Sequence, residues 1–394
     1  MRDLTNLKTY IIDSEDPQEV DDAISLEITA DNVYKLWVHI SNPCILFKFG
    51  SLIDEEARRK NCSLYLTEEY IPMLPVDIIS KANLQQNKIS ETISTSIEFK
   101  EDGSIKNYEL IEAKIRPKYQ LTYEDVDEII ELEPNEEFEL VELKKLLLNS
   151  FLYRKKCGAI SFENLSTNIK LEKGKIILNK IERTISKVIV SEAMILMGYV
   201  TSLFLINNNL TGAFRSQKFI CNPNNVLEKY KESQIKYIIL KQYMGKSFIS
   251  TKPSKHECLG LSSYVQCTSP LRRYLDLIIQ RQVYNKLNHY SEIDNIYFSN
   301  IIENSKSRQL EINNIYKNDK IKYLIKFFKQ ENNKFYKIIF VKWINKKRNI
   351  ALVYFPDYLL ETLIILYVSI DIYSNKIYKI KYYLNDSNHL EFIY

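Results

Sequence analysis

Near its N-terminus the chain reads Ile12-Asp-Ser-Glu-Asp-Pro-Gln-Glu-Val-Asp-Asp-Ala23. This run places six carboxylates within ten residues, and no Lys or Arg lies between Lys8 and Lys35. Carboxylates crowded in this way repel one another unless a cation is bound between them. The run therefore predicts a cation site, and an acidic surface turn is the alternative.

The segments on either side of this run indicate how its carboxylates come together. Residues 9–13 are expected to form a strand, and residues 23–28 and 33–40 show the period-two alternation of β-strands. Asp13 ends the first strand, whereas Asp21 and Asp22 begin the second and point to opposite sides of the chain. We expect a small antiparallel meander whose first loop brings the three aspartates close together.

Asp13, Asp21 and Asp22 are hard oxygen ligands of the kind that suits Mg²⁺ or Mn²⁺. Such ions can orient a phosphodiester, activate water and stabilise a leaving oxygen. A calcium-binding EF-hand is disfavoured, because Gln18 stands where that loop needs glycine and no helix enters it. Zinc is also disfavoured, because the four histidines lie far from one another and from any Cys pair.

A second motif reads Cys267-Thr-Ser-Pro-Leu-Arg-Arg-Tyr-Leu-Asp276. Thr or Ser can cap a helix and Pro270 can open it, so we expect a helix over about 271–288. Arg272 and Arg273 then fall in the first turn, where cations oppose the helix dipole unless an anion such as phosphate binds there. The alternative is that one of the two pairs with Asp276, and Arg281 could likewise be structural.

Composition and charge set limits on the class of protein. With 394 residues, 45% hydrophobic and 26% charged, the chain can bury a full core and does not need disulfides, so its six scattered cysteines favour a reducing compartment. The most apolar segment, Val188 to Ile206, contains Glu192 and is expected to be a buried helix rather than a membrane span. The start of the chain lacks the features of a signal or transit peptide, so we expect the protein to stay where it is made.

Charge is unevenly spread along the chain. Residues 124–142 carry ten acidic side chains and no basic one, whereas residues 316–349 carry eleven Lys or Arg and two acids. The C-terminal third is therefore the expected polyanion-facing part, and two solvated helix faces of opposite sign are the alternative. From Lys334 onward short β-type runs predict one small OB-type barrel.

The two motifs together resemble the RNB, or ribonuclease II, family. Ile12-Asp-x5-Glu-x-Asp-Asp-Ala23 is similar to its catalytic signature, and Thr268-Ser-Pro-Leu-Arg-Arg-Tyr-x-Asp276 to its arginine motif. Further likenesses follow in the family's order, at Trp37-Val-His-Ile-Ser-Asn-Pro43, Ser63-Leu-Tyr-Leu66, Ile71-Pro-Met-Leu-Pro75, Gly158-Ala-Ile-Ser-Phe162, Glu192-Ala-Met194 and His256-x-x-Leu-Gly-Leu261. The resemblance covers residues 9 to about 329.

The resemblance implies roles for individual residues. Asp13, Asp21 and Asp22 would hold the metals and activate water, and Arg272 would grip the scissile phosphate. The residues implied to contact RNA are Tyr65 and Phe162 as base-stacking clamps, Tyr123 beside the 3′ end, Glu192 near the ribose, and Arg273 and Arg281. For each aromatic, ordinary core packing is the alternative in a chain with 28 tyrosines.

The chain departs from the family pattern at several positions. Glu19, included among the catalytic residues, stands where the family usually has Asp, and its extra methylene is expected to loosen the metal geometry. Ser191 stands where a Glu often precedes Glu192, and Gln280 replaces the usual His before Arg281. Only about a dozen residues precede Asp13, so the family's N-terminal cold-shock domains are expected to be absent.

The sequence thus predicts an α+β protein with an RNB core of mixed sheet and helices over 1–330 and a degenerate OB-like RNA-binding barrel over 331–394. The expected reaction is 3′→5′ hydrolysis of single-stranded RNA to nucleoside 5′-monophosphates with Mg²⁺, or Mn²⁺, as cofactor. The alternative is a catalytically weakened RNB-fold protein that binds RNA. We expect a monomer off the membrane, in a plastid or the cytoplasm of an AT-rich bacterium, with an accessory RNA-binding partner left open.

Overall fold

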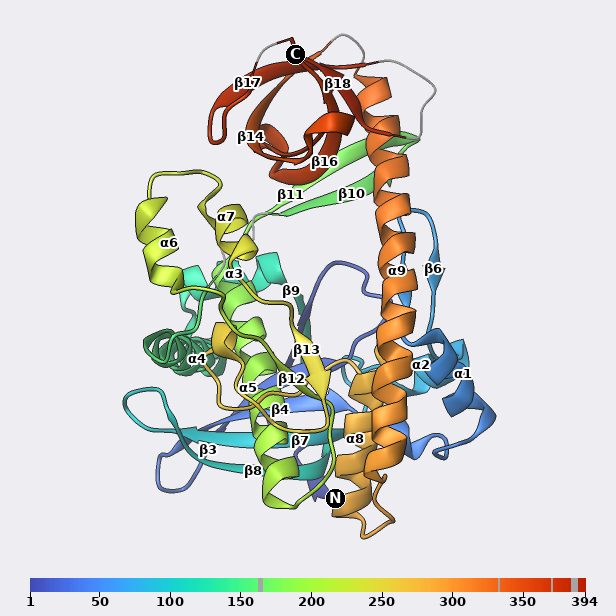
Figure 1. Cartoon of the computed structure of the whole chain (residues 1–394). Coiled ribbons are helices and arrows are strands. Elements are labelled where there is room, and N and C mark those ends of the chain that lie inside the picture. Colours follow the sequence, from blue (N-terminus) through green and yellow to red (C-terminus); the bar gives the residue numbers. More distant parts are fainter. Residues whose placement is uncertain (162–165, 332–333, 370, 384–388) are drawn as a thin grey trace.

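The chain is described by a computed structural model that covers residues 1–161, 166–331, 334–369, 371–383 and 389–394. A mixed sheet of seven strands, in the spatial order β1-β8-β7-β4-β3-β2-β9, forms the base of the molecule (Figure 1). Its strands are β1 (Arg2–Asp3), β2 (Thr9–Asp13), β3 (Asp22–Ile28), β4 (Tyr34–Ser41), β7 (Ser90–Phe99), β8 (Ile105–Ile115) and β9 (Tyr119–Thr122). β2, β3 and β4 are antiparallel neighbours, which confirms the predicted meander.

The sheet register places both ends of the acidic loop together. Tyr10 of β2 pairs with Ile24 of β3, so the end of β2 and the start of β3 lie at the same edge of the sheet. β9 runs parallel to β2 and pairs Thr122 with Asp13. Thr122 then caps α3 (Tyr123–Leu132) through a capping box with Asp125. The acidic loop and the start of α3 therefore share one edge.

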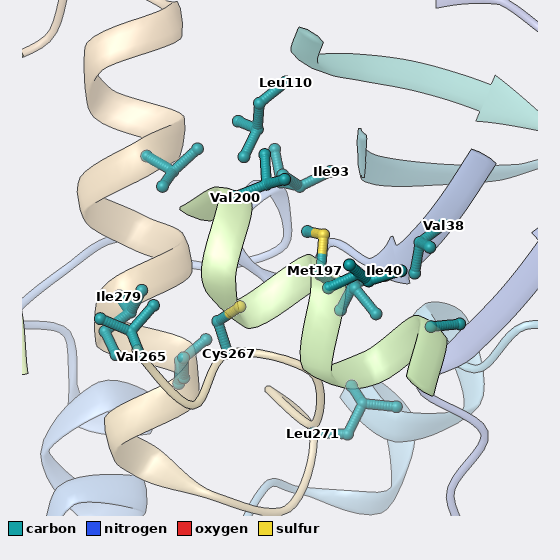
Figure 2. Close-up of a cluster of buried hydrophobic side chains, with 14 of the residues drawn as sticks. Val38, Ile40, Ile93, Leu110, Met197, Val200, Val265, Cys267, Leu271 and Ile279 are labelled. Atoms are coloured by element: carbon teal, nitrogen blue, oxygen red, sulfur yellow. The ribbon is translucent and has the colours of Figure 1, made fainter. Parts of the chain in front are cut away.

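Helix α5 (Ile185–Asn207) is the central helix of the core. Its side chains Met197 and Val200 lie beside Ile40 of β4 and Ile93 of β7 (Figure 2). By length and composition α5 could cross a membrane, but 61% of its most apolar window is buried inside the molecule. It is the buried helix that the sequence predicted.

The remaining helices and hairpins surround this core. The helices are α1 (Leu52–Lys60), α2 (Val76–Ala82), α4 (Phe138–Lys156), α6 (Pro223–Lys229), α7 (Lys236–Gln242), α8 (Tyr274–Leu287) and α9 (Asn295–Gln330). The two-stranded sheets are the hairpins β5 (Leu64–Tyr65) with β6 (Tyr70–Ile71) and β10 (Ser166–Glu172) with β11 (Lys175–Ile181), and the pair β12 (Phe214–Ser216) with β13 (Phe248–Ser250), whose strands are separated by α6 and α7.

The helix predicted to open at Pro270 begins later, so Arg272 and Arg273 are not in its first turn. The backbone at Arg273 is extended, with φ −137° and ψ 118°, and forms a β-bridge with Cys62. Ser63 N–H donates to the Arg272 carbonyl over 3.0 Å, which commits that carbonyl to the neighbouring segment. This pairing with a distant part of the chain delays α8 to Tyr274, and an anion site in its first turn has no support.

The C-terminal strands close into a five-stranded barrel in the order β14-β15-β16-β18-β17, which confirms the predicted OB-like barrel (Figure 1). The strands are β14 (Phe335–Asn345), β15 (Ile350–Phe355), β16 (Leu360–Tyr367), β17 (Ile377–Tyr382) and β18 (Glu391–Ile393). The last turns of α9 insert Tyr323, Leu324, Phe327 and Phe328 into the barrel core. A domain boundary at residue 330 stays a prediction, because α9, which ends there, packs against both the core around the seven-stranded sheet and the core of the barrel.

Candidate active site

The two motifs found in the sequence meet through a buried ion pair. Asp21 is 2% exposed, and its carboxylate accepts from Arg272 Nε over 2.9 Å and from Leu271 N–H over 3.0 Å. Burial raises the pKa of Asp21, whereas the charge of Arg272 acts in the opposite direction. The Arg272 side chain is 40% exposed, and among the described residues its other N–H groups have no partner. They are free to bind an anion.

Asp13 and Asp22 lie beside this pair and leave their carboxylates available. Asp13 accepts only from Ser14 N–H and Oγ, and within the described parts of the chain no donor reaches the Asp22 side chain. Burial and the negative charges of Asp21 and Asp13 raise the pKa of Asp22 to about 7. Asp22 thus has the features of a carboxylate that lacks a compensating cation.

The fit of a divalent cation to these residues is partial. Among the described residues no group of three or more His, Cys, Asp or Glu side chains is arranged to hold a metal ion. Asp21 is committed to Arg272, so the predicted set of three aspartates is not brought together as ligands. The donor chemistry of Asp13 and Asp22 still fits Mg²⁺, because their mutual repulsion is what a hard cation relieves.

Glu19 occupies a different position from the aspartates. It is 4% exposed, and its carboxylate accepts from Ser63 Oγ over 2.7 Å and from the Tyr65 hydroxyl. Burial raises the pKa of Glu19 to about 7, while the hydrogen bond from Ser63 opposes this rise. The Glu19 side chain is therefore long enough to reach both donors. These contacts do not support the expectation that its extra methylene loosens the metal geometry.

The aromatic residues implied by the family resemblance have separate surroundings. Tyr65 is 41% exposed, and its ring centroid lies 5.3 Å from that of Tyr70. Tyr123 opens α3 beside the aspartates, and burial together with the charges of Asp13 and Asp22 raises its pKa. Lys187 Nζ lies 5.7 Å from the Tyr123 ring centroid. Phe162 lies outside the described residues.

Glu192 lies at the wall of a cavity next to this edge. It is 1% exposed and is held by Arg154 Nε over 2.8 Å and by Ser150 Oγ over 3.0 Å. The cavity measures about 360 Å³ and is lined by Glu192, Arg154, Arg183, Ser191, Ser161 and Lys187. Lys187 of this cavity also lies over Tyr123, so one side chain of the cavity wall reaches the start of α3.

Two arginines predicted to contact RNA are engaged by hydrogen bonds within the protein. Arg273 bonds to Asp276, Ser269 and Thr268, which is the pairing foreseen as the alternative. Arg281 is 5% exposed and donates to the carbonyls of residues 44 and 47 over 2.5 and 2.7 Å. These contacts hold the buried Arg281 against the loop before α1 and favour a structural role.

The sequence did not single out the side chains that hold the predicted residues in place. Ser63 bonds to Glu19, and Arg154 neutralises Glu192. Ser63 does fall in one of the matched motifs, but Arg154 lies in none of them. Its partner is 38 residues away, so only the fold reveals the contact.

Comparison with known proteins identifies the family. The model of the RNB domain matches residues 1–289. The chain belongs to the RNB domain family. An uncharacterized ribonuclease of Synechocystis is 30% identical over 91% of this chain and 54% of its own, and a chloroplastic/mitochondrial ribonuclease II of Arabidopsis thaliana is 32% identical over 71% of this chain and 36% of its own.

Solved structures agree on the RNB fold. RNase R of Mycoplasma genitalium in complex with ribose-methylated single-stranded RNA has a TM-score of 0.87 at 20% identity, over 100% of this chain and 71% of that one. Yeast Ssd1, a pseudonuclease, has a TM-score of 0.74 at 16% identity, over 92% of this chain and 50% of that one. This RNB chain spans about half or less of the length of the curated relatives described here.

Proposed function

We propose that this RNB protein is a 3′→5′ exoribonuclease that hydrolyses single-stranded RNA to nucleoside 5′-monophosphates. The observation that carries the proposal is the contact of Arg272 with Asp21, 251 residues apart, at the edge where Asp13 and Asp22 have no cationic partner among the described residues. An arginine with free donors, opposite carboxylates that would hold a cation, can bind one phosphodiester from both sides. The ribonuclease relatives make RNA the expected polymer.

The chain's own residues divide the reaction between them. In the hydrolysis, a water oxygen bonds to the last phosphorus and the bond from that phosphorus to the 3′ oxygen of the preceding nucleotide breaks. Asp13 and Asp22 would hold Mg²⁺, or Mn²⁺, and the bound cation supplies charge stabilisation at the reacting phosphate. Arg272 would bind the phosphate oxygens through its free N–H groups, as Asp21 fixes the guanidinium plane.

The substrate's last nucleotides would lie between the carboxylates and the adjoining cavity. Tyr65 would stack on a base, and Tyr123 would lie beside the 3′ end next to Asp13. Glu192, fixed by Arg154, would accept from a ribose hydroxyl in the cavity of about 360 Å³. Such a contact distinguishes RNA from DNA, because only RNA carries the 2′ hydroxyl. Phe162 follows the cavity residue Ser161 in the chain and completes the set implied for stacking.

A direct assay tests the proposal. Purified protein is incubated with 5′-labelled poly(A) and Mg²⁺, with and without EDTA, and the products are separated by size. Progressive shortening from the 3′ end that stops with EDTA is the expected result. RNA that stays at full length with every divalent ion tried would refute the nuclease proposal.

The second candidate is a protein of the same fold that binds RNA without cleaving it. The commitment of Asp21 to Arg272, with no group of three metal-ligating side chains among the described residues, is the observation that favours it. A gel-shift assay on the same poly(A) separates the two. Binding with no shortening in Mg²⁺ or Mn²⁺ supports the second candidate.

The relatives include chloroplast/mitochondrial and bacterial proteins. A plastid or a bacterial cytoplasm is the compartment that we propose, because the composition rich in Lys, Asn, Ile and Tyr is typical of an AT-biased genome. We further propose that the protein acts as a monomer, with or without an accessory RNA-binding partner.

A further inference from the structure

The long helix α9 contacts the segment that carries the donors to Glu19. α9 runs beside the β5–β6 hairpin and continues into the barrel (Figure 1). Three of its side chains, Tyr316, Asp319 and Tyr323, follow one another at spacings of three and four residues and therefore share one face. We infer that this face positions Ser63 and Tyr65 against Glu19, and so controls the chemical step of the proposed RNA hydrolysis.

The hydroxyl of Tyr316 bonds to the backbone of both residues that donate to Glu19. Its hydroxyl accepts from the Tyr65 N–H over 3.1 Å and lies 3.5 Å from the Ser63 carbonyl oxygen, to which it donates. Ser63 Oγ and the Tyr65 hydroxyl are the two groups that donate to Glu19. A single hydroxyl on α9 therefore fixes the backbone of both residues.

Asp319 and Tyr323 hold the tip of the same hairpin. The Asp319 carboxylate accepts from Thr67 N–H over 3.0 Å and from Thr67 Oγ1 over 2.8 Å. The Tyr323 hydroxyl donates to Glu68. With Tyr316, these contacts fix Ser63, Tyr65, Thr67 and Glu68, whereas Leu66 N–H donates within the hairpin to the Glu69 carbonyl.

The segment ending at Tyr65 also reaches Arg272. Ser63 N–H donates to the Arg272 carbonyl over 3.0 Å, and Tyr274 N–H donates to the Asn61 carbonyl over 2.9 Å. A shift of the segment would therefore move Glu19's donors and the backbone of Arg272 together. Distances of a few tenths of an ångström matter at such a site, because the reacting groups need near-ideal alignment.

Tyr323 extends this arrangement to the barrel. Its ring is 1% exposed and belongs to the barrel core with Phe328, while its hydroxyl bonds to the hairpin. The residue thus contacts the barrel core and the hairpin at once. The position of the barrel on α9 is in this way linked to the donors of Glu19.

The test uses the full chain and removes one hydroxyl at a time. Tyr316→Phe keeps the ring and loses only the bonds to Ser63 and Tyr65. Tyr297→Phe is the matched control, because its hydroxyl lies on the same helix but accepts from Arg58 of α1 over 3.0 Å. With 5′-labelled poly(A) and Mg²⁺, Tyr316→Phe should lower kcat about fivefold or more with KM changed by less than about twofold, and Tyr297→Phe should leave both unchanged.

A double variant separates positioning from general loss of stability. In a Tyr65→Phe background one of the two donors to Glu19 is already absent and only Ser63 remains, so adding Tyr316→Phe should cause a smaller further fall in kcat than it does in the unaltered chain. Asp319→Asn keeps one acceptor oxygen for Thr67 and should retain more activity than Asp319→Ala. Additive losses in the double variant, or equal losses in Tyr316→Phe and Tyr297→Phe, would overturn the inference.

The inference rests on the proposed function, and a second measurement keeps the two distinguishable. Hydrogen exchange of the backbone amides of residues 63–71 reports positioning without catalysis. Tyr316→Phe should speed this exchange and Tyr297→Phe should not. If the unaltered chain cuts no RNA but this exchange pattern holds, the nuclease proposal fails and the positioning stands; unchanged exchange overturns the positioning itself.

Discussion

At the scale of single residues, the carboxylates of Asp21 and Asp22 differ in whether they have hydrogen-bond donors. Asp21 has a guanidinium and a backbone N–H as partners, whereas Asp22 has no donor among the described residues and two acidic neighbours. Removing the charge of Asp21 would leave Arg272 without its anchor. Removing the charge of Asp22 relieves repulsion, so the two substitutions should have opposite effects on binding.

Asp22→Asn should abolish hydrolysis and leave RNA binding equal or tighter. The substitution removes a proposed metal ligand and, at the same time, a negative charge that repels the phosphate. Product formation and the dissociation constant are measured on the same labelled poly(A). Full turnover by this variant would show that the metal site is assigned to the wrong residues.

The raised pKa of Asp22 predicts how Mg²⁺ binding depends on pH. The folded protein holds this proton up to about pH 7, whereas the unfolded chain loses it near pH 4, so raising the pH between these values destabilises the cation-free fold through Asp22. A cation binds the ionised form and must displace the proton below pH 7. The increase in Tm caused by Mg²⁺ should therefore be small at pH 5.5 and larger at pH 8.

Thermal unfolding with and without Mg²⁺ at the two pH values measures this effect. Asp22→Asn, which has no proton to displace, should show little difference between them. The same Mg²⁺-induced rise in Tm at both pH values in the unaltered chain would mean that Asp22 is not a ligand.

Arg272 and Arg273 are adjacent in sequence and should differ in function. Arg272→Lys keeps a charge for Asp21 but loses the planar fork of donors, so kcat should fall about 10²-fold or more with a smaller change in RNA affinity. Arg273→Lys should mainly lower Tm, because the Arg273 contacts are to Asp276, Ser269 and Thr268. A larger fall in kcat for Arg273→Lys would reverse the assignment.

At the scale of elements, Arg281 shows how a helix is fixed to the loop before α1. From α8 it donates to the Cys44 carbonyl, within a short 3-10 helix at residues 43–45, and to the Phe47 carbonyl just after that helix. Arg281→Met should destabilise the fold by about 2 kcal/mol or more, because it leaves buried carbonyls unpaired, and should leave RNA affinity unchanged below Tm. Chemical denaturation measures the first effect, with Lys286→Met on the same helix as control. Loss of affinity with normal stability would restore the RNA-contact role.

Elements with local signals were predictable from the sequence. The strand at residues 9–13 and the buried helix in the apolar run Val188 to Ile206 depend on neighbours in the chain, and both are present in the structure. The predicted start of α8 was wrong, because the backbone of Arg273 pairs with that of Cys62, 211 residues earlier. Such a distant partner leaves no mark in the local pattern.

The same limit applied to the candidate site. Family motifs indicated Asp21 and Arg272, which the fold brings into contact. They did not indicate that Glu19 would be held by Ser63 and Tyr65, because side-chain hydrogen bonds over 44 and 46 residues depend on the loop path. Residue type was therefore easier to predict than orientation.

At the scale of the whole molecule, the lysines of the C-terminal part are not equivalent. Lys337 of β14 and Lys379 of β17 lie directly opposite each other and are exposed, with no ion-pair partner among the described residues. Like charges that face each other across a sheet repel. Phe335, 67% exposed, opposes Lys381 on the same two strands. A phosphate chain bound along this surface would relieve the repulsion between the two lysines.

Replacing both Lys337 and Lys379 with Gln should flatten the salt dependence of RNA binding. Each lost phosphate contact removes about 0.7 from the slope of log K against log salt on a single strand, so the slope should decrease by about 1.4. The matched control replaces Lys286 and Lys306, which are ion-paired with Glu292 and Glu303 and should leave the slope unchanged. Affinity is measured by fluorescence anisotropy on a labelled oligo(A) over a salt series without Mg²⁺. Equal slopes for both double variants and the unaltered chain would mean that the barrel does not contact RNA through this surface.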